Sequence, residues 1–215
     1  MSKVAVLGSG VVGQVLADGF LKHGYDVIRG TRDPAKLAEW QSKSGPKASV
    51  ADFATAAKNA DLVVLAVKGS AAEEAVKLTG PTNLANKTVI DTTNPIAPAP
   101  PTNGVLQYIT GPNDSLMERL QKLAPEARLV KAFSSTGNAN FVNPDFHGTR
   151  PSMFICGNDD TAKKEVTTIL TQFGWDTEDL GKVEAARAIE PLCMLWCIPG
   201  FLNNSWTHAF KVLKR

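Results

Sequence analysis

The sequence predicts a doubly wound α/β fold, and three observations lead to that prediction. A β-prone run, Val4 to Leu7, leads directly into the pattern G-x-G-x-x-G formed by Gly8, Gly10 and Gly13. Strand-like and helix-like segments then alternate along the chain, which is typical of parallel βαβ units with right-handed crossovers. One strand-like segment, Leu62–Val67, is apolar throughout, as expected of a strand buried on both faces. Together these features predict a Rossmann-type parallel sheet.

Each glycine of the motif has its own physical reason. Gly8 allows the tight turn from strand to helix, Gly10 lets a diphosphate approach the backbone, and Gly13 lets the helix pack on the strand. The free N–H groups at the start of that helix, together with the helix dipole, favour a doubly charged diphosphate. Because a strand precedes the motif and an amphipathic helix follows it, the sequence predicts a dinucleotide site.

The second strand, Tyr25–Gly30, indicates which dinucleotide binds. An NAD-binding protein would place a carboxylate near the end of this strand, and none is present. Thr31 and Arg32 stand there instead, and Lys36 follows one turn later. A hydroxyl and a forked, permanently charged guanidinium suit a 2′-phosphate. We therefore expect NADP rather than NAD, with solvated surface charges as the alternative interpretation.

The remaining elements follow from hydrophobic periodicity and end signals. Extended segments are expected at 47–49, Thr88–Asp91, Leu129–Phe133 and Met153–Cys156. Helices are expected at Pro34–Ser44, Val50–Asn59, Ser70–Thr79 with Ser70 as the N-cap, Leu116–Leu123, 160–173, and from Val183 to the end with a break at Pro199-Gly200.

A domain boundary is expected near Gly148 to Pro151. Residues 1–150 would form the NADP-binding Rossmann domain. Residues 151–215 are too few for a large separate substrate domain. We expect this small C-terminal segment, largely helical, to complete the sheet and wall the substrate cleft.

Three loops leave the carboxyl ends of predicted strands, where ligands bind in open α/β sheets. They are the stretch from Val67 and Lys68 to Ser70, the proline-rich segment 92–114, and the segment 134–140. The segment 92–114 carries five of the thirteen prolines, and a connection of this length is usually functional. A solvated connection rich in turn formers is the alternative.

Composition narrows the class further. The 215 residues are 43% hydrophobic, the formal net charge is +2, and there are three cysteines. These values predict a folded core, no nucleic-acid partner and a reducing, cytoplasmic location. The chain shows no signal-peptide pattern, and its longest apolar stretch, Pro191–Leu202, reads as too short for a membrane span.

Residues that usually carry acid–base or metal chemistry are sparse. The three histidines are scattered and predict no metal site, and Cys193 and Cys197 are expected in the core. No Ser-His-Asp order or carboxylate pair stands out from the scattered surface acids. This pattern favours direct hydride transfer without a catalytic side chain, since such a reaction needs mainly the juxtaposition of donor and acceptor.

The sequence resembles the NADPH-dependent deazaflavin reductases, also called coenzyme F420-dependent NADP oxidoreductases, over nearly its whole length. The resemblance is carried by the fingerprint Gly8 to Gly10, by the tip Gly30 to Arg32 with Lys36, by the run Cys156 to Asp160, and by the helix that begins near Glu190. It implies a Rossmann-type fold and hydride transfer between NADP(H) and a deazaflavin, or a flavin, as the second substrate.

The resemblance also implies roles for individual residues. The diphosphate would lie on Ser9, Gly10, Val11 and Val12, the 2′-phosphate on Thr31, Arg32 and Lys36, and the nicotinamide near Val67 and Ala132. Lys68 and Asn94 are expected to bind the cofactor as well. The second substrate would contact Pro95, Ser134, Thr136 and His208, with His208 on the last helix.

The segments 92–95 and 134–136 depart from the pattern of the archaeal enzymes, and the same fold forms the reductase module of membrane metalloreductases, which uses a flavin. Two rival functions therefore stay open. One is an NADPH-dependent dehydrogenase or imine reductase, which usually needs a much larger helical domain. The other is a non-enzymatic NADP sensor. Excess apolar surface on the last helix, with the resemblance, suggests a homodimer.

Overall fold

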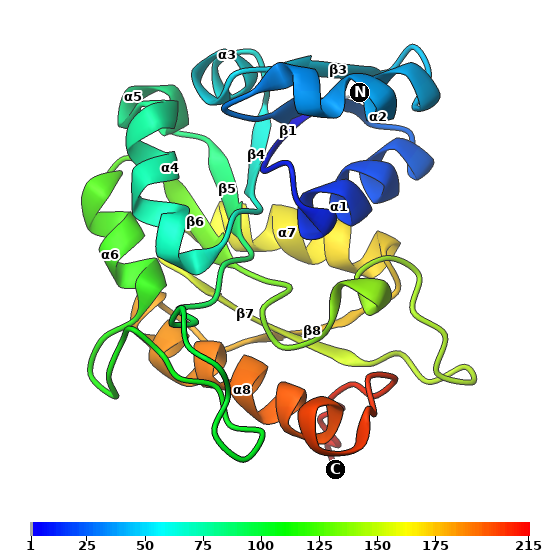
Figure 1. Cartoon of the computed structure of the whole chain (residues 1–215), viewed down its shortest axis with the longest axis vertical. Helices are drawn as coiled ribbons and strands as arrows, with labels where there is room; N and C mark the ends of the chain where they lie inside the picture. Colours follow the sequence, from blue (N-terminus) through cyan, green and yellow to red (C-terminus); the bar gives the residue numbers. More distant parts are fainter. Residues whose placement is uncertain (1) are drawn as a thin grey trace.

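The computed structural model describes residues 2–215, which form one eight-stranded sheet covered by helices (Figure 1). Its order, β3-β2-β1-β4-β5-β6-β7-β8, places the first six strands in the doubly wound arrangement that was predicted. The strands are β1 (Lys3–Leu7), β2 (Asp26–Gly30), β3 (Ala48–Ala51), β4 (Leu62–Leu65), β5 (Thr88–Asp91), β6 (Arg128–Lys131), β7 (Ser152–Gly157) and β8 (Asp176–Asp179). Strands β1 to β6 pair in parallel, β7 runs antiparallel to β6, and β8 is parallel to β7.

The helices follow the strands in the expected alternation. The α-helices are α1 (Val11–Lys22), α2 (Ala38–Lys43), α3 (Phe53–Lys58), α4 (Ala72–Thr79), α5 (Pro81–Leu84), α6 (Leu116–Leu123), α7 (Asp160–Gln172) and α8 (Ala186–Asn203). Short 3-10 turns, η1 (Pro34–Leu37), η2 (Gly69–Ala71), η3 (Asn138–Asn140) and η4 (Val183–Ala185), accompany them.

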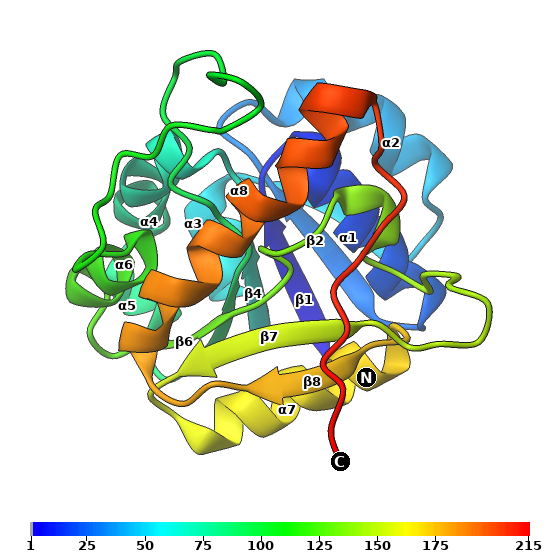
Figure 2. The same ribbon diagram turned by 90° about the horizontal axis from the view of Figure 1, so that it is seen from below.

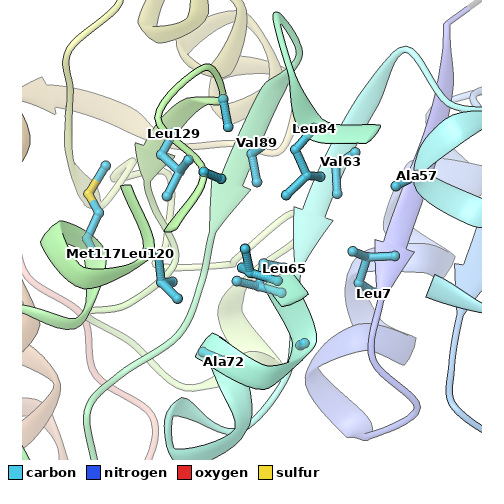
Figure 3. Packing of buried hydrophobic residues seen from close by; sticks show 14 of the residues in the cluster. Leu7, Ala57, Val63, Leu65, Ala72, Leu84, Val89, Met117, Leu120 and Leu129 are labelled. Carbon is cyan, nitrogen blue, oxygen red and sulfur yellow. The ribbon is translucent and has the colours of Figure 1, made fainter. Parts of the chain in front are cut away.

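Two apolar cores lie on the two faces of the sheet. On one face, side chains of the central strands pack against α3, α4, α5 and α6, where Leu65, Val89 and Leu120 meet (Figure 3). On the other face, α1 and α7 pack through residues such as Phe20 and Phe173, whose ring centroids are 5.1 Å apart. A sheet covered on both faces explains the continuous apolar runs of its central strands.

Several predicted boundaries are wrong for local reasons. Residues expected to start the helix Val50–Asn59 instead finish strand β3, because Asp52 is the true N-cap: its side chain accepts hydrogen bonds from Thr55 N at 2.8 Å. Ser70 is not an N-cap, because it lies inside the turn η2 and α4 begins only at Ala72. Strand β8 was missed because Asp176–Asp179 is an edge strand with polar side chains.

The predicted break at Pro199-Gly200 is also wrong. Helix α8 continues through Pro199, which removes only one N–H donor, and ends at Asn203. Asn204 then adopts a left-handed conformation (φ 52°), a common way to stop a helix. The last twelve residues are not helical and return across the molecule to β7 and β8 (Figure 2). There Ser152 N donates to Phe210 O at 2.8 Å, and Lys211 pairs with Asp176.

Candidate functional site

The glycine turn joins β1 to α1 at the carboxyl edge of the sheet. Gly8 has φ +143°, and a Cβ there would lie 2.1 Å from the carbonyl oxygen of Ala66, so only glycine fits. Gly10 is the N-cap of α1, and a Cβ on it would meet no atom within 4 Å. The backbone is therefore open to a ligand at Gly10, next to the free N–H groups that begin α1.

A cavity of about 520 Å³ lies on this turn and extends between the tip of β2 and helix α4. Nine of the residues predicted to bind the cofactor line it: Gly8, Ser9, Gly10, Val11, Val12, Thr31, Arg32, Val67 and Lys68. The lining is completed by Phe53, Ala66, Ala71, Glu74, Ala75 and Leu78, all of them apolar except Glu74. A cavity with one apolar wall and one polar rim has the form of a nucleotide site.

The tip of β2 carries the polar end of the cavity. Thr31 is buried, and its Oγ1 accepts a hydrogen bond from Asp33 N at 3.2 Å. Arg32 is exposed and forms no ion pair with any residue in the range 2–215. Lys36 lies instead in a neighbouring open hollow of about 760 Å³, which Ser9 also lines. Ser9 therefore stands between the two hollows.

The other predicted cofactor residues lie outside this cavity. Gly13 is buried in α1, where a Cβ would lie 2.5 Å from Gly8 O, so it serves helix packing. Asn94 and Ala132 follow β5 and β6, at the neighbouring strand ends. Asn94 Nδ2 donates to the carbonyl oxygen of Ser134 at 3.1 Å, which joins the two loops.

Two polar atoms of these loops are buried without a partner among the described residues. They are Asn94 Oδ1 and Ser134 Oγ. Buried polar atoms are usually satisfied, so a water molecule or a ligand group would complete the hydrogen bonding of these two atoms.

The residues predicted for a second substrate are only partly brought together. Pro95 is buried, and its carbonyl oxygen accepts from Ile109 N at 2.8 Å. Thr136 Oγ1 accepts from Asn140 Nδ2 at 3.3 Å, and the same amide donates to His208 O at 3.4 Å. Thr136 and His208 thus share Asn140 as a neighbour.

The placement of His208 on the last helix is wrong, because it lies in the extended tail that follows α8. Its ring stacks on Trp196, with centroids 5.0 Å apart and an interplanar angle of 24°. Trp196 Nε1 donates to the His208 carbonyl oxygen at 2.7 Å, and its ring lies against Gly137. The tail and α8 together therefore support the loop 134–140.

A buried ion network lies at the carboxyl ends of β5 and β6, and it was not predicted from the sequence. Lys131, Asp91 and Glu190 are all at most 2% exposed, and Lys131 Nζ lies 2.6 Å from Asp91 Oδ2 and 2.9 Å from Glu190 Oε1. Burial alone would lower the pKa of Lys131, but the two adjacent carboxylates raise it, so the ammonium stays charged. The expectation that no carboxylate pair stands out from the surface acids is wrong.

This network ties several elements together. Lys131 Nζ also donates to Thr93 O at 2.8 Å, in the loop after β5. Glu190, on α8, accepts from the N–H groups of Leu116 and Met117 at 3.0 Å each, which caps α6. The Glu190 carbonyl oxygen accepts from Tyr108 OH at 2.8 Å, in the proline-rich segment. A charged residue inside a predicted buried strand, Lys131, was the signal that could have revealed it.

Cys156 offers no reactive thiol at this edge. Burial raises the pKa of Cys156 to about 12, and its Sγ lies 3.7 Å from Met117 Sδ. Cys193 is buried and Cys197 is half-buried, and both are free thiols. Among residues 2–215, no group of three or more His, Cys, Asp and Glu side chains could hold a metal ion.

Comparison with known proteins gives consistent matches. The profile of the family described as NADP oxidoreductase, coenzyme F420-dependent, matches residues 3–95. The F420-dependent NADP reductase of Methanocaldococcus jannaschii is 28% identical over 90% of both chains. Metalloreductase STEAP3 of Rattus norvegicus is 28% identical over 93% of this chain, but the chain spans only 39% of that protein's length.

Solved structures agree with this result. A protein of Arthrobacter sp. FB24, named as a candidate F420-dependent NADP-reductase, is 34% identical over 100% of both chains with a TM-score of 0.93. A reductive aminase of Aspergillus terreus shares the fold alone, at 20% identity and a TM-score of 0.66, and is matched over 63% of its length. By the full-length match at 34% identity, this chain belongs to the coenzyme F420-dependent NADP oxidoreductases, a family of NADP-dependent enzymes.

Proposed function

We propose that this protein transfers a hydride between NADP(H) and a deazaflavin or flavin-like acceptor. The observation that carries the proposal is the cavity of about 520 Å³, because it gathers the glycine turn, Thr31 and Arg32 around one volume. The relatives named for NADP and coenzyme F420 support the choice of both partners.

On the nucleotide side, the open face of Gly10 and the N–H groups that begin α1 would bind the diphosphate. Thr31 and Arg32 would bind the 2′-phosphate, with Lys36 adding charge from the neighbouring hollow. The apolar wall formed by residues such as Val67 and Leu78 would cover the adenosine. Once bound, the nicotinamide supplies or accepts the hydride.

On the acceptor side, Ser134 would hold a polar group of a planar ring through its Oγ, and the neighbouring Asn94 would bind the cofactor through its Oδ1. Lys68, Pro95, Ala132 and Thr136 would line the space around the nicotinamide and this ring. His208, through its stacking on Trp196, would support the loop 134–140 from behind.

No side chain of this edge is proposed as a catalytic acid or base. Lys131, Asp91 and Glu190 pair with one another and with backbone groups, so they would hold loops in place instead of exchanging protons. Orientation of two reactants can contribute about 7–11 kcal/mol when the reacting atoms are held in line. The fixed loops would supply that orientation.

The test mixes the protein with NADPH and either oxidised deazaflavin or oxidised flavin mononucleotide, and follows the loss of the acceptor's visible absorbance. We expect bleaching of the deazaflavin, and direct transfer of label from NADPH deuterated at the nicotinamide. Loss of absorbance with the flavin alone would identify a flavin, instead of a deazaflavin, as the acceptor. Turnover of a cyclic imine would favour the imine reductase alternative, and NADPH binding without any turnover would favour a sensor.

We also propose a homodimer built on the exposed apolar side of α8 and the tail. Leu195 is 54% exposed, Leu202 57%, and Phe201 and Trp206 are exposed as well. Such a patch is unusual on a small monomeric protein. Light scattering should give twice the chain mass, and Leu195→Glu with Leu202→Glu should give the monomer mass.

The expectation that the stretch Pro191–Leu202 is too short for a membrane span does not hold for the helix that contains it, because Val183–Asn203 has the length and composition of a span. A third of this segment is buried in the fold, however, and its Glu190 pairs with Lys131. We therefore assign it as a helix of this fold. Three free cysteines fit a cytoplasmic location, which fractionation of cells expressing the tagged chain would test.

A further inference from the structure

Arg29, in strand β2, is a buried cation without a counter-ion. Its side chain is 1% exposed, and it forms no ion pair with any residue between 2 and 215. Its Nε is buried and has no hydrogen-bond partner in that range. Burying a charge is costly unless it is paired, so an unpaired buried guanidinium requires an explanation.

The guanidinium lies directly against the glycine turn. Arg29 Nη2 donates to the carbonyl oxygens of Gly8 and Gly10, at 3.2 and 3.3 Å. Gly8 and Gly10 also line the cavity of about 520 Å³ at the glycine turn. By holding the carbonyl groups, Arg29 fixes the direction in which the N–H groups of the turn point.

The surroundings of Arg29 hold it in place without neutralising it. The guanidinium lies over the Trp40 ring, 4.9 Å from the centroid, and Trp40 Nε1 donates to Asp18 Oδ1 at 2.7 Å. Arg29 lines the open hollow of about 760 Å³ that also contains Lys36. Besides Asp18, the acid at this hollow is Glu39, which pairs with Lys43 at 2.7 Å. Desolvation by burial lowers the pKa of Arg29, and the charge of Asp18, which forms no ion pair with it, opposes that change only in part.

We infer that Arg29 is a positioning residue for the nucleotide, and that its missing counter-charge is supplied by the phosphates of the bound dinucleotide. This inference rests on the proposed binding of NADP at the glycine turn. It assigns to Arg29 a role different from that of Arg32, which would touch the 2′-phosphate. Arg29 acts through the turn, so it serves NADPH and NADH alike.

The decisive experiment compares Arg29→Met, Arg29→Lys, Asp18→Asn and the parent chain, each in its melting temperature and in its affinity for NADPH and NADH by calorimetry. Arg29→Met removes an unpaired buried charge, so we expect the nucleotide-free protein to melt at or above the parent temperature. Its affinity for both nucleotides should fall about ten- to hundredfold, the loss expected for hydrogen bonds and charge acting on phosphate.

Asp18→Asn keeps the acceptor for Trp40 Nε1 but removes the carboxylate whose charge acts on Arg29. If the charge of Arg29 serves the phosphates, this variant should bind both nucleotides a few-fold more tightly. A purely structural Arg29 would leave that affinity unchanged. Arg29→Lys keeps the charge without the fork, so its affinity should lie between those of the parent and Arg29→Met.

Binding by Arg29→Met within twofold of the parent would overturn the inference. If Arg29→Met does not fold, unchanged affinities in both Asp18→Asn and Arg29→Lys would overturn it equally. A parent chain that binds neither nucleotide would overturn the proposed function itself. If the parent chain binds NADPH but reduces no acceptor, the affinities of the Arg29 variants still test the inference.

Discussion

The carboxyl edge of the sheet carries two polar regions of opposite construction. At the glycine turn, the polar groups are short of partners: Arg29 has no counter-ion within residues 2–215, Arg32 is solvated, and the backbone at Gly10 faces open space. At the ends of β5 and β6, by contrast, Lys131 and two carboxylates are buried and pair with one another.

This difference indicates that the glycine turn serves ligand binding and that the Lys131 network serves the stability of the fold. Polar groups without partners around a cavity break few hydrogen bonds when a ligand binds, and the ligand supplies the missing contacts. Buried groups that already pair with one another would have to break those contacts to bind a ligand, so their effect is to fix the geometry of the elements that they join. Damage to the first region should therefore remove ligand affinity, and damage to the second should remove stability.

The largest effect on binding is expected from Gly10→Val. A Cβ at Gly10 meets no protein atom within 4 Å, so the variant should fold normally, but its side chain would fill the place of the diphosphate. Calorimetry should detect no NADPH binding, while circular dichroism matches the parent.

Gly13→Val is the matched control. Its Cβ would lie 2.5 Å from Gly8 O, so this variant should lose stability as well as binding. Normal NADPH binding by a folded Gly10→Val would remove the assignment of this turn.

The largest effect on stability is expected from Lys131→Met. Removal of the ammonium leaves Asp91 and Glu190 as uncompensated buried carboxylates, which costs about 3–5 kcal/mol. Urea unfolding at neutral pH measures the loss.

Additional neutralisation by Asp91→Asn and Glu190→Gln should recover part of that loss, because the buried charges are then gone. A single Lys131→Met variant that costs less than about 1 kcal/mol would contradict the supporting role of the network.

The features predicted from the sequence are those that depend on local patterns. The glycine turn, the β2 tip and strands such as β5 rest on local patterns, and the fold predicted from them is confirmed. Strand β8 and the tail depend on distant partners, such as the pair of Lys211 with Asp176, so no local pattern revealed them. The cofactor and substrate residues stay predictions.

Burial was the other missing quantity. Arg29 and Lys131 appear in the sequence as ordinary charged residues, yet they are 1% and 0% exposed. Alternation along a strand cannot show that a cation points into the protein when helices cover both faces. The sequence therefore predicted a ligand-binding edge, but it did not reveal the buried charges beneath that edge.

Arg32→Ala should have an intermediate effect that is restricted to one nucleotide. If Arg32 binds the 2′-phosphate, NADPH binding should weaken by about 1.5–3 kcal/mol, the range for hydrogen bonds to charged groups. NADH binding should hardly change. Equal losses for both nucleotides in calorimetry would leave Arg32 without the predicted role and would move selectivity to Thr31 or Lys36.

The smallest effect concerns Glu118, which ties α6 to α8 at the rim of the supporting region. Glu118 accepts from Arg187 at 2.6 and 2.9 Å and from Ser115 Oγ at 2.7 Å. The hydrogen bond from Arg187 holds the pKa of Glu118 below its usual value of 4.5, although burial opposes this. A carboxyl whose pKa is lowered by folding adds stability above its unfolded pKa and loses it as the pH falls through the folded pKa. The difference in unfolding free energy between the parent and Glu118→Gln should therefore be constant above about pH 5.5 and shrink below about pH 4.5. Arg187 is solvated, so the plateau should be far smaller than the loss in Lys131→Met. A difference that does not change with pH would mean that the ion pair between Glu118 and Arg187 contributes nothing to stability.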